Sequence, residues 1–188
     1  MLIYQLYLKK NFMKTLKFIL FTLIATTILS CSDNSTEPAF ILSNESLAGD
    51  YDIAVLNIDI ETTAEVAGVA VTISNTAIVG DTFQVDVIIN ANGTYSASGQ
   101  YRVVSTVTPV GTAPITDTEI IVFSDSGSYS VNAVDDTITF MALGDTLLAG
   151  TFNVTVFNET SVTLSQQVEE TIGDITSSIN MNLSLERK

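Results

Sequence analysis

The sequence predicts an all-β fold: an antiparallel up-and-down β-barrel of about eight to ten strands. Two observations carry this prediction. Apolar and polar residues alternate through most of the chain after residue 47, which is the period of a strand with one buried and one solvated face. Short stretches rich in Gly, Asn and Asp separate the alternating segments, as in a meander of hairpins. No stretch of this region has a convincing helical period.

The clearest element is the segment 81–108. Apolar residues occupy every second position from Phe83 to Ile89, and the pattern resumes from Tyr95 to Val107 after the turn 90–93. An alternating run, a turn containing Asn and Gly, and a second alternating run predict a β-hairpin with one solvated face.

The other strands follow in chain order. We expect a first strand over 50–60, with a bulge near Val55 where the apolar parity changes. Further strands are expected at 69–73, 115–123, 129–133, 138–140, 152–156, 162–168 and 175–185. Turns are expected at 109–114, at Asp135-Asp136 and at 158–160. Pairing of the first strand with the last would remove both edges of the sheet.

Residues 1–30 are predicted to form an export signal, and Met13 is an alternative start. Lys14 and Lys17 precede an apolar stretch at 18–29, which is shorter than the ~20 residues needed to span a bilayer. The stretch ends at Ile28-Leu29-Ser30-Cys31, which resembles the signal of bacterial lipoproteins. The resemblance implies that Cys31 carries acyl chains such as palmitate and becomes the new amino terminus.

A secretory signal with a cysteine nearby by chance is the alternative interpretation. Cys31 is the only cysteine of the chain, and an unpaired thiol in an oxidising compartment needs an explanation that acylation supplies. Residues 31–46 are polar, contain Pro38 and have no sustained period, so we interpret them as the lipidated cysteine and a flexible tether. Residues 47–188 form the predicted barrel domain.

Charge is distributed unevenly along the chain. Four of the seven basic residues precede Cys31, so the remainder has three bases against all 21 acids, a formal charge of −18. A domain with this charge repels phosphate backbones, which excludes nucleic acid as a partner. It also repels anionic lipid head groups, so attachment to a membrane requires the covalent anchor.

The residue types offer little catalytic chemistry. The chain has no histidine, which removes the commonest neutral-pH base and imidazole metal sites together. The nearest carboxylate pairs are Asp50/Asp52, at a solvated strand start, and Asp135/Asp136, in a turn that favours aspartate. No acidic stretch has the spacing of a known calcium loop. We expect no enzyme activity, no cofactor and no metal, although calcium binding by acidic loops stays open.

The chain resembles the lipocalin-like lipoproteins of Gram-negative bacteria. The matching segments are 47–51, 90–95, 135–140 and 162–164. The resemblance implies a lipocalin-like barrel that a lipid anchor holds at the outer membrane, on its periplasmic or cell-surface face. The family's tryptophan is replaced by Tyr51, and we identify no counterpart of the basic residue that packs on it, because Arg102 falls on the polar face.

Seven aromatic residues on the inward parity are candidates either to line a ligand site or to fill the core: Tyr51, Phe83, Tyr95, Tyr101, Tyr129, Phe140 and Phe152. A barrel of about eight strands is either filled by side chains or wide enough for one small ligand. The leading hypothesis is a module that binds a small apolar or amphipathic ligand. The alternative is a structural or interaction lipoprotein with a filled barrel, whose outer face or loops bind a protein or a glycan.

Overall fold

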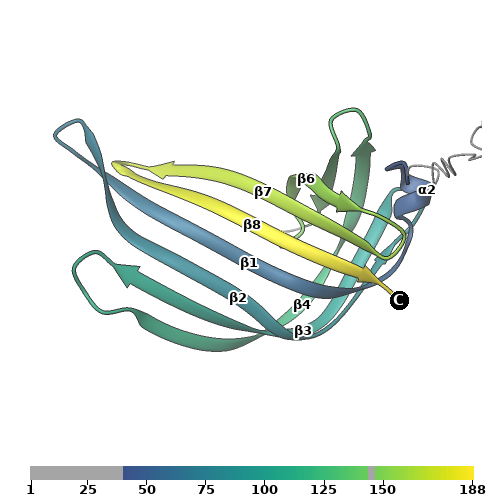
Figure 1. Cartoon of the computed structure of the whole chain (residues 1–188), viewed down its shortest axis with the longest axis horizontal. Helices are drawn as coiled ribbons and strands as arrows, with labels where there is room; N and C mark the ends of the chain where they lie inside the picture. Colours follow the sequence, from purple (N-terminus) through teal and green to yellow (C-terminus); the bar gives the residue numbers. More distant parts are fainter. Residues whose placement is uncertain (1–39, 144–146) are drawn as a thin grey trace, which may run out of the picture. The chain divides into compact units, whose positions relative to one another are not determined.

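Eight antiparallel strands form a closed ring of hydrogen bonds in the computed structural model, which describes residues 40–143 and 147–188 (Figure 1). The strands are β1 (Gly49–Val66), β2 (Val69–Ile89), β3 (Thr94–Pro109), β4 (Ile115–Asn132), β5 (Thr137–Ala142), β6 (Gly150–Phe157), β7 (Ser161–Ile172) and β8 (Ile175–Arg187). Neighbours in sequence are neighbours in the sheet, and β1 also pairs with β8. The predicted all-β, up-and-down closed sheet is therefore confirmed.

Two of the long strands bend where the ladder shifts register. In β1 the shift against β8 lies between Ile53 and Val55, as the change of apolar parity predicted. In β2 the shift against β3 lies between Asp81 and Gln84, and Thr82 within it has a positive φ of 52°. These bulges let long strands curl around the core and leave their outer halves to continue as a sheet.

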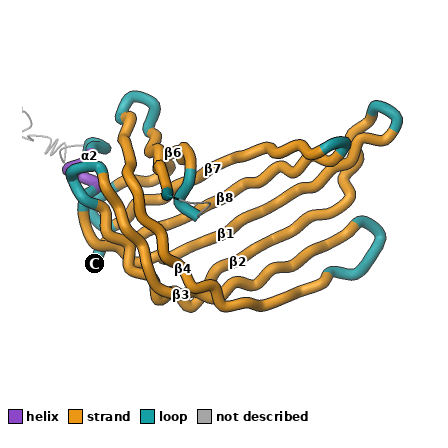
Figure 2. The backbone as a smooth tube through the Cα atoms, turned by 180° about the vertical axis from the view of Figure 1, so that it is seen from behind, coloured by secondary structure: helices purple, strands orange, loops and turns teal. Residues whose placement is uncertain are grey.

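The strands differ greatly in length, and this divides the molecule into two parts. β5 has 6 residues and β6 has 8, whereas β2 has 21. The ring is complete only where β5 and β6 supply its wall, and we call this the closed part. Beyond it, β4, β3, β2, β1, β8 and β7 continue side by side as an open sheet (Figures 1 and 2).

The hydrophobic core fills the closed part. Its most deeply buried large side chains are Leu47, Tyr51, Leu56, Ile138, Leu148, Phe152, Leu164, Leu183 and Leu185. Aromatic rings meet edge to face within it: Phe140 contacts Tyr95 at 5.1 Å and Phe152 at 5.8 Å between ring centroids. The alternation read from the sequence thus places one face of each strand in this core.

Two expected divisions of strands need correction. The strand expected at 69–73 and the first strand of the 81–108 hairpin are one strand, β2, because 74–80 also pair with both neighbours. The strands expected at 115–123 and 129–133 are likewise one strand, β4. Both were missed because a long strand needs no interruption where it bends.

The tether expected over 31–46 is folded from residue 40 onward. Ser43 caps the short helix α2 (Asn44–Leu47): its hydroxyl accepts a hydrogen bond from the Ser46 N–H, and Leu42 is buried. Short polar residues such as serine favour helix caps as well as linkers, so the composition did not distinguish the two. The predicted signal peptide, Cys31 and the rest of the tether lie outside the described residues.

Candidate functional site

The seven predicted aromatic residues belong to the core or pack against it. Tyr51, Tyr95, Tyr101, Tyr129, Phe140 and Phe152 are buried, and Phe83 is half-buried. Phe83 stacks on Tyr101, with ring centroids 5.9 Å apart, and Tyr101 meets Phe123 edge to face. Tyr95, Tyr129 and Phe152 all contact Phe140 and form a second group of rings.

The small inward residue Gly99 serves close backbone packing. A Cβ atom at Gly99 would lie 1.9 Å from the backbone oxygen of Gln84 on β2, and the φ of Gly99 is +145°. The β2 bulge brings the two strands into contact at this point, so the missing side chain accommodates backbone.

Tyr51 is covered by a basic residue that sequence reasoning missed. Arg187 pairs with Tyr51 across β8 and β1, and its guanidinium carbon lies 5.1 Å from the centre of the Tyr51 ring. The guanidinium donates hydrogen bonds to Ser46 O at 2.7 Å, Ala48 O at 2.9 Å and the Tyr51 hydroxyl at 2.7 Å. The signal was present in the sequence, because Arg187 shares its parity with the inward Leu183 and Leu185.

Arg187 thus packs on the ring of Tyr51, whereas Arg102 binds Asp81. Tyr51 in turn donates its hydroxyl proton to Leu47 O at 2.6 Å. Burial raises the pKa of Tyr51, and the charge of Arg187 and its hydrogen bond partly oppose that rise. The cluster ties the first strand, the last strand and α2 into one end of the closed part.

Among the described residues, one carboxylate is buried. Asp125, on β4, is 6% exposed and accepts a hydrogen bond from the Tyr95 hydroxyl at 3.1 Å. Tyr95 also lies 3.3 Å from the carbonyl oxygen of Leu148, in the β5–β6 connection. A buried acid is costly without partners, and the Tyr95 hydroxyl provides one here.

The inner face of the open sheet continues the core. Cross-strand partners project to the same face of a sheet, so the pairing defines rows of side chains. The row through the buried Leu56 and Leu183 is followed by Ser105–Ile78–Ile58–Met181–Gln166 and then by Val107–Thr76–Ile60–Ile179–Val168. We call the face that carries these rows the inner face.

The inner face carries further aliphatic side chains toward the hairpin ends as its exposure increases, although the polar row Ser74–Thr62–Ser177–Glu170 interrupts them. Ile58, Ile60 and Ile78 are half-buried, whereas Val66, Val69 and Ile172 near the hairpin ends are 58%, 62% and 72% exposed. The opposite, outer face is more polar, as in the row Thr106–Ala77–Asp59–Asn180–Gln167, although Val79, Ile120 and Val122 are exposed on it. Exposed apolar side chains gathered on one face mark binding or interaction sites.

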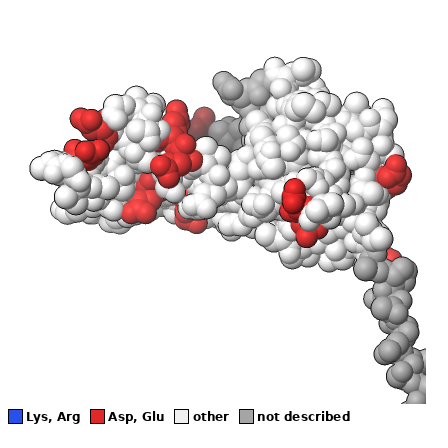
Figure 3. All heavy atoms as spheres, turned by 90° about the horizontal axis from the view of Figure 1, so that it is seen from above, with Lys and Arg blue, Asp and Glu red and all other residues white. Residues whose placement is uncertain are grey.

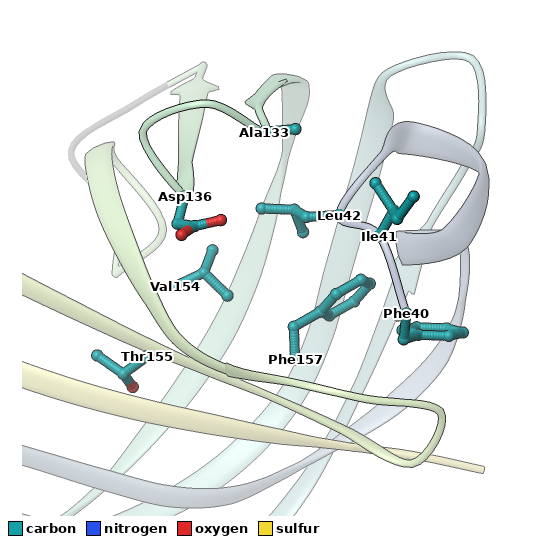
Figure 4. A pocket seen from close by; sticks show the side chains of 8 residues that line it. All are labelled: Phe40, Ile41, Leu42, Ala133, Asp136, Val154, Thr155 and Phe157. Atoms are coloured by element: carbon teal, nitrogen blue, oxygen red, sulfur yellow. The ribbon is translucent and has the colours of Figure 1, made fainter. Parts of the chain in front are cut away.

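A pocket of about 310 Å³ lies beside the amino-terminal segment that leads into α2 (Figure 4). It is lined by Phe40, Ile41, Leu42, Ala133, Asp136, Val154, Thr155 and Phe157. Leu42 reaches toward Asp136 and Val154, and the rings of Phe40 and Phe157 lie 4.7 Å apart. The volume is at the lower end of ligand pockets, and Asp136 is its one charged side chain.

Acidic side chains gather toward the hairpin ends of the open sheet, and no Lys or Arg is visible on the face in Figure 3. The three bases of the described residues are all engaged elsewhere. Arg102 binds Asp81 at 2.6 Å and lowers the pKa of that carboxyl by hydrogen bonding, while Lys188 contacts Asp52 at 3.0 Å and also Asp86. The carboxylates of the hairpin ends therefore lack a basic neighbour within the described part of the chain.

Neither a metal site nor a catalytic cluster emerges from the described residues. No group of three or more His, Cys, Asp or Glu side chains is close enough there to hold a metal ion. Of the carboxylate pairs, Asp50 and Asp52 are exposed at the start of β1, and Asp135 and Asp136 form the β4–β5 turn. None of the described residues belongs to a helix long and apolar enough to cross a bilayer.

Comparison with known proteins adds little. No protein-family profile matches the sequence, and no curated protein matches it significantly. Among solved structures, the chain is similar to the crystal structure of Ail, the attachment invasion locus protein of Yersinia pestis. That alignment has 8% sequence identity and a TM-score of 0.23, and covers 76% of this chain and 100% of the other. A TM-score of this size carries no functional information.

Proposed function

We propose that this protein is a lipid-anchored, non-enzymatic binding module of the outer membrane that takes a small apolar or amphipathic molecule on the inner face of its open sheet. The observation that carries the proposal is the aliphatic lining of that face, which continues from the core and becomes exposed where β5 and β6 no longer cover it. Burial of such surface against an apolar ligand contributes roughly 25 cal/mol per Å² before the costs of association.

Two adjacent residues provide a matched test of the ligand site. Ile78 projects from the inner face and Val79 from the outer face, where it is 46% exposed. We expect the purified protein to bind an environment-sensitive apolar dye saturably. Ile78→Gln should weaken the affinity for the dye about tenfold or more, and Val79→Gln should leave it unchanged. Absence of saturable binding, or equal effects of the two variants, would refute the assignment.

The support for the anchor is the sequence Ile28-Leu29-Ser30-Cys31, which resembles a lipoprotein signal. In a Gram-negative host, metabolic labelling with an alkyne analogue of palmitate should mark the wild-type chain and the Ser35→Ala control. Cys31→Ser should abolish the label. Label retained on Cys31→Ser would show that this cysteine is not the acylation site, without bearing on the ligand.

The second candidate function is an interaction lipoprotein with a filled barrel. It is favoured by the burial of six of the seven predicted aromatic residues. Cross-linking in intact envelopes tests it: a specific adduct to a protein is expected for this function and not for a carrier of small molecules.

A further inference from the structure

One edge of β4 is without a partner strand over most of its length. β4 pairs with β3 from Ile115 to Ser128, but β5 pairs with β4 only from Gly127 to Asn132. The Leu143 N–H donates to Ser126 O, and beyond that point no described strand lies along β4. The segment 115–125 is therefore a margin of the open sheet (Figure 2).

The direction of two hydrogen bonds identifies the backbone groups at this margin. Alternate residues of a strand direct their N–H and C=O groups to opposite neighbours. Tyr129 N–H donates to Gly93 O on the β3 side, whereas Ser126 O accepts from the β5 side. Even-numbered residues from 116 to 124 therefore face the free margin. Thr118 is consistent with this assignment, because its N–H donates to the side chain of Asp117 at 2.9 Å and not to a neighbouring strand.

The side chains along the free margin differ between the two faces. On the outer face, Ile120 is 64% and Val122 is 80% exposed. On the inner face, Asp117 and Glu119 are exposed and lie next to the half-buried Ile121. An exposed margin with aliphatic side chains invites another strand, and inward-pointing charges limit which strand can pair.

Charge complementarity selects the occupant. A second copy of this chain would be repelled, since the part after residue 30 has a formal charge of −18 in each copy. A strand with Lys or Arg on its inner side would instead neutralise Asp117 and Glu119. Aliphatic residues on its outer side would pack beside Ile120 and Val122 as cross-strand neighbours.

We propose that the free margin of β4 binds an extended, basic segment of a partner protein by strand addition, with alternating basic and aliphatic side chains. Main-chain hydrogen bonds supply affinity in this mode of recognition, and the side chains on either face supply specificity. The inference goes beyond the apolar ligand of the inner face, and it gives the interaction alternative a defined surface.

The probe is a fluorescently labelled peptide of alternating lysine and valine, about seven residues long, which matches a typical strand. The control peptide has the same sequence, but the backbone N–H groups that would donate hydrogen bonds to β4 are methylated. The control therefore keeps its charge and cannot pair as a strand. We expect saturable binding of the peptide by fluorescence anisotropy, and at least about tenfold weaker binding of the control.

Protein variants test the same point from the other side. Val122→Pro removes an N–H that faces the free margin and leaves the β3 ladder intact, so it should weaken peptide binding about tenfold. Val122→Thr keeps the N–H and should bind within about threefold of wild type. The double variant Asp117→Asn/Glu119→Gln should weaken binding and reduce its salt dependence.

Equal binding of the N-methylated and unmodified peptides would overturn the proposal, because attraction would then be electrostatic alone; so would a lack of saturable binding. Self-association of the wild type that Val122→Pro abolishes would also overturn it, in favour of a second copy. Dye binding to the inner face should be unchanged in Val122→Pro, so failure of this inference and failure of the proposed ligand site are distinguishable. If Val122→Pro does not fold, the comparison of the unmodified and N-methylated peptides on the wild-type protein still tests the proposal.

Discussion

Replacement of Arg187 by methionine removes the group that joins the last strand of the barrel to the first strand and to α2. Methionine keeps an unbranched apolar side chain of similar length over Tyr51 but donates no hydrogen bond. The change therefore takes away three hydrogen bonds, to Ser46 O, Ala48 O and the Tyr51 hydroxyl, together with the cation–π contact.

The expected loss of unfolding free energy is about 4 kcal/mol. Each hydrogen bond from a charged donor contributes roughly 1.5–3 kcal/mol net when its acceptor is buried. We take the lower half of that range, because the site is partly buried and Tyr51 keeps its bond to Leu47 O. The cation–π contact adds about 0.5–1 kcal/mol. The buried Nε of Arg187 has no hydrogen-bond partner in the described structure. Its removal therefore relieves a desolvation cost, which reduces the expected loss.

Urea unfolding followed by far-ultraviolet circular dichroism measures this loss, and the chain has no tryptophan to report instead. Arg102→Met is the matched control, because Arg102 binds Asp81 on the exposed outer face. We expect a much smaller loss at Arg102, and one that shrinks with added salt, whereas the loss at Arg187 should persist. Equal losses in the two variants would refute the role of Arg187 in closing the barrel.

Three further outcomes are expected. Burial, and secondarily nearby negative charge, raises the pKa of Tyr129 to about 12 in the folded protein, against about 10 in the unfolded chain. Stability should therefore be retained below about pH 10 and fall as the pH rises toward 12, and the urea midpoint of Tyr129→Phe should depend less on pH in that window. Tyr95→Phe removes the hydrogen bond to Asp125 and should cost about 1–3 kcal/mol in urea unfolding; no loss would mean that the buried acid needs no donor. Gly99→Ala should destabilise the protein severely, with a large fall in melting temperature, whereas Gly111→Ala, where a Cβ meets nothing within 4 Å, should show only the smaller strain of its positive φ.

Local patterns predicted most of the strands because alternation is a property of each strand by itself. The turn at 90–93, the bulge near Val55 and the inward set from Ile175 to Leu185 were all readable in this way. Arg187 belongs to the same inward set of β8. The residues around it in the sequence do not indicate that it covers the ring of Tyr51. Its role depends on the closure of β8 against β1, which brings together residues 136 positions apart.

The sequence by itself determined which side chains of most strands face inward, and so the all-β class and the up-and-down order of strands. Only the tertiary structure decided that β5 and β6 are too short to complete the wall, that the inner face is exposed beyond them, and that β4 has a free margin. The physical reason is that alternation reports the burial of side chains on two faces of a strand. The hydrogen bonds of its two edges lie in the plane of the sheet and leave no mark on that pattern.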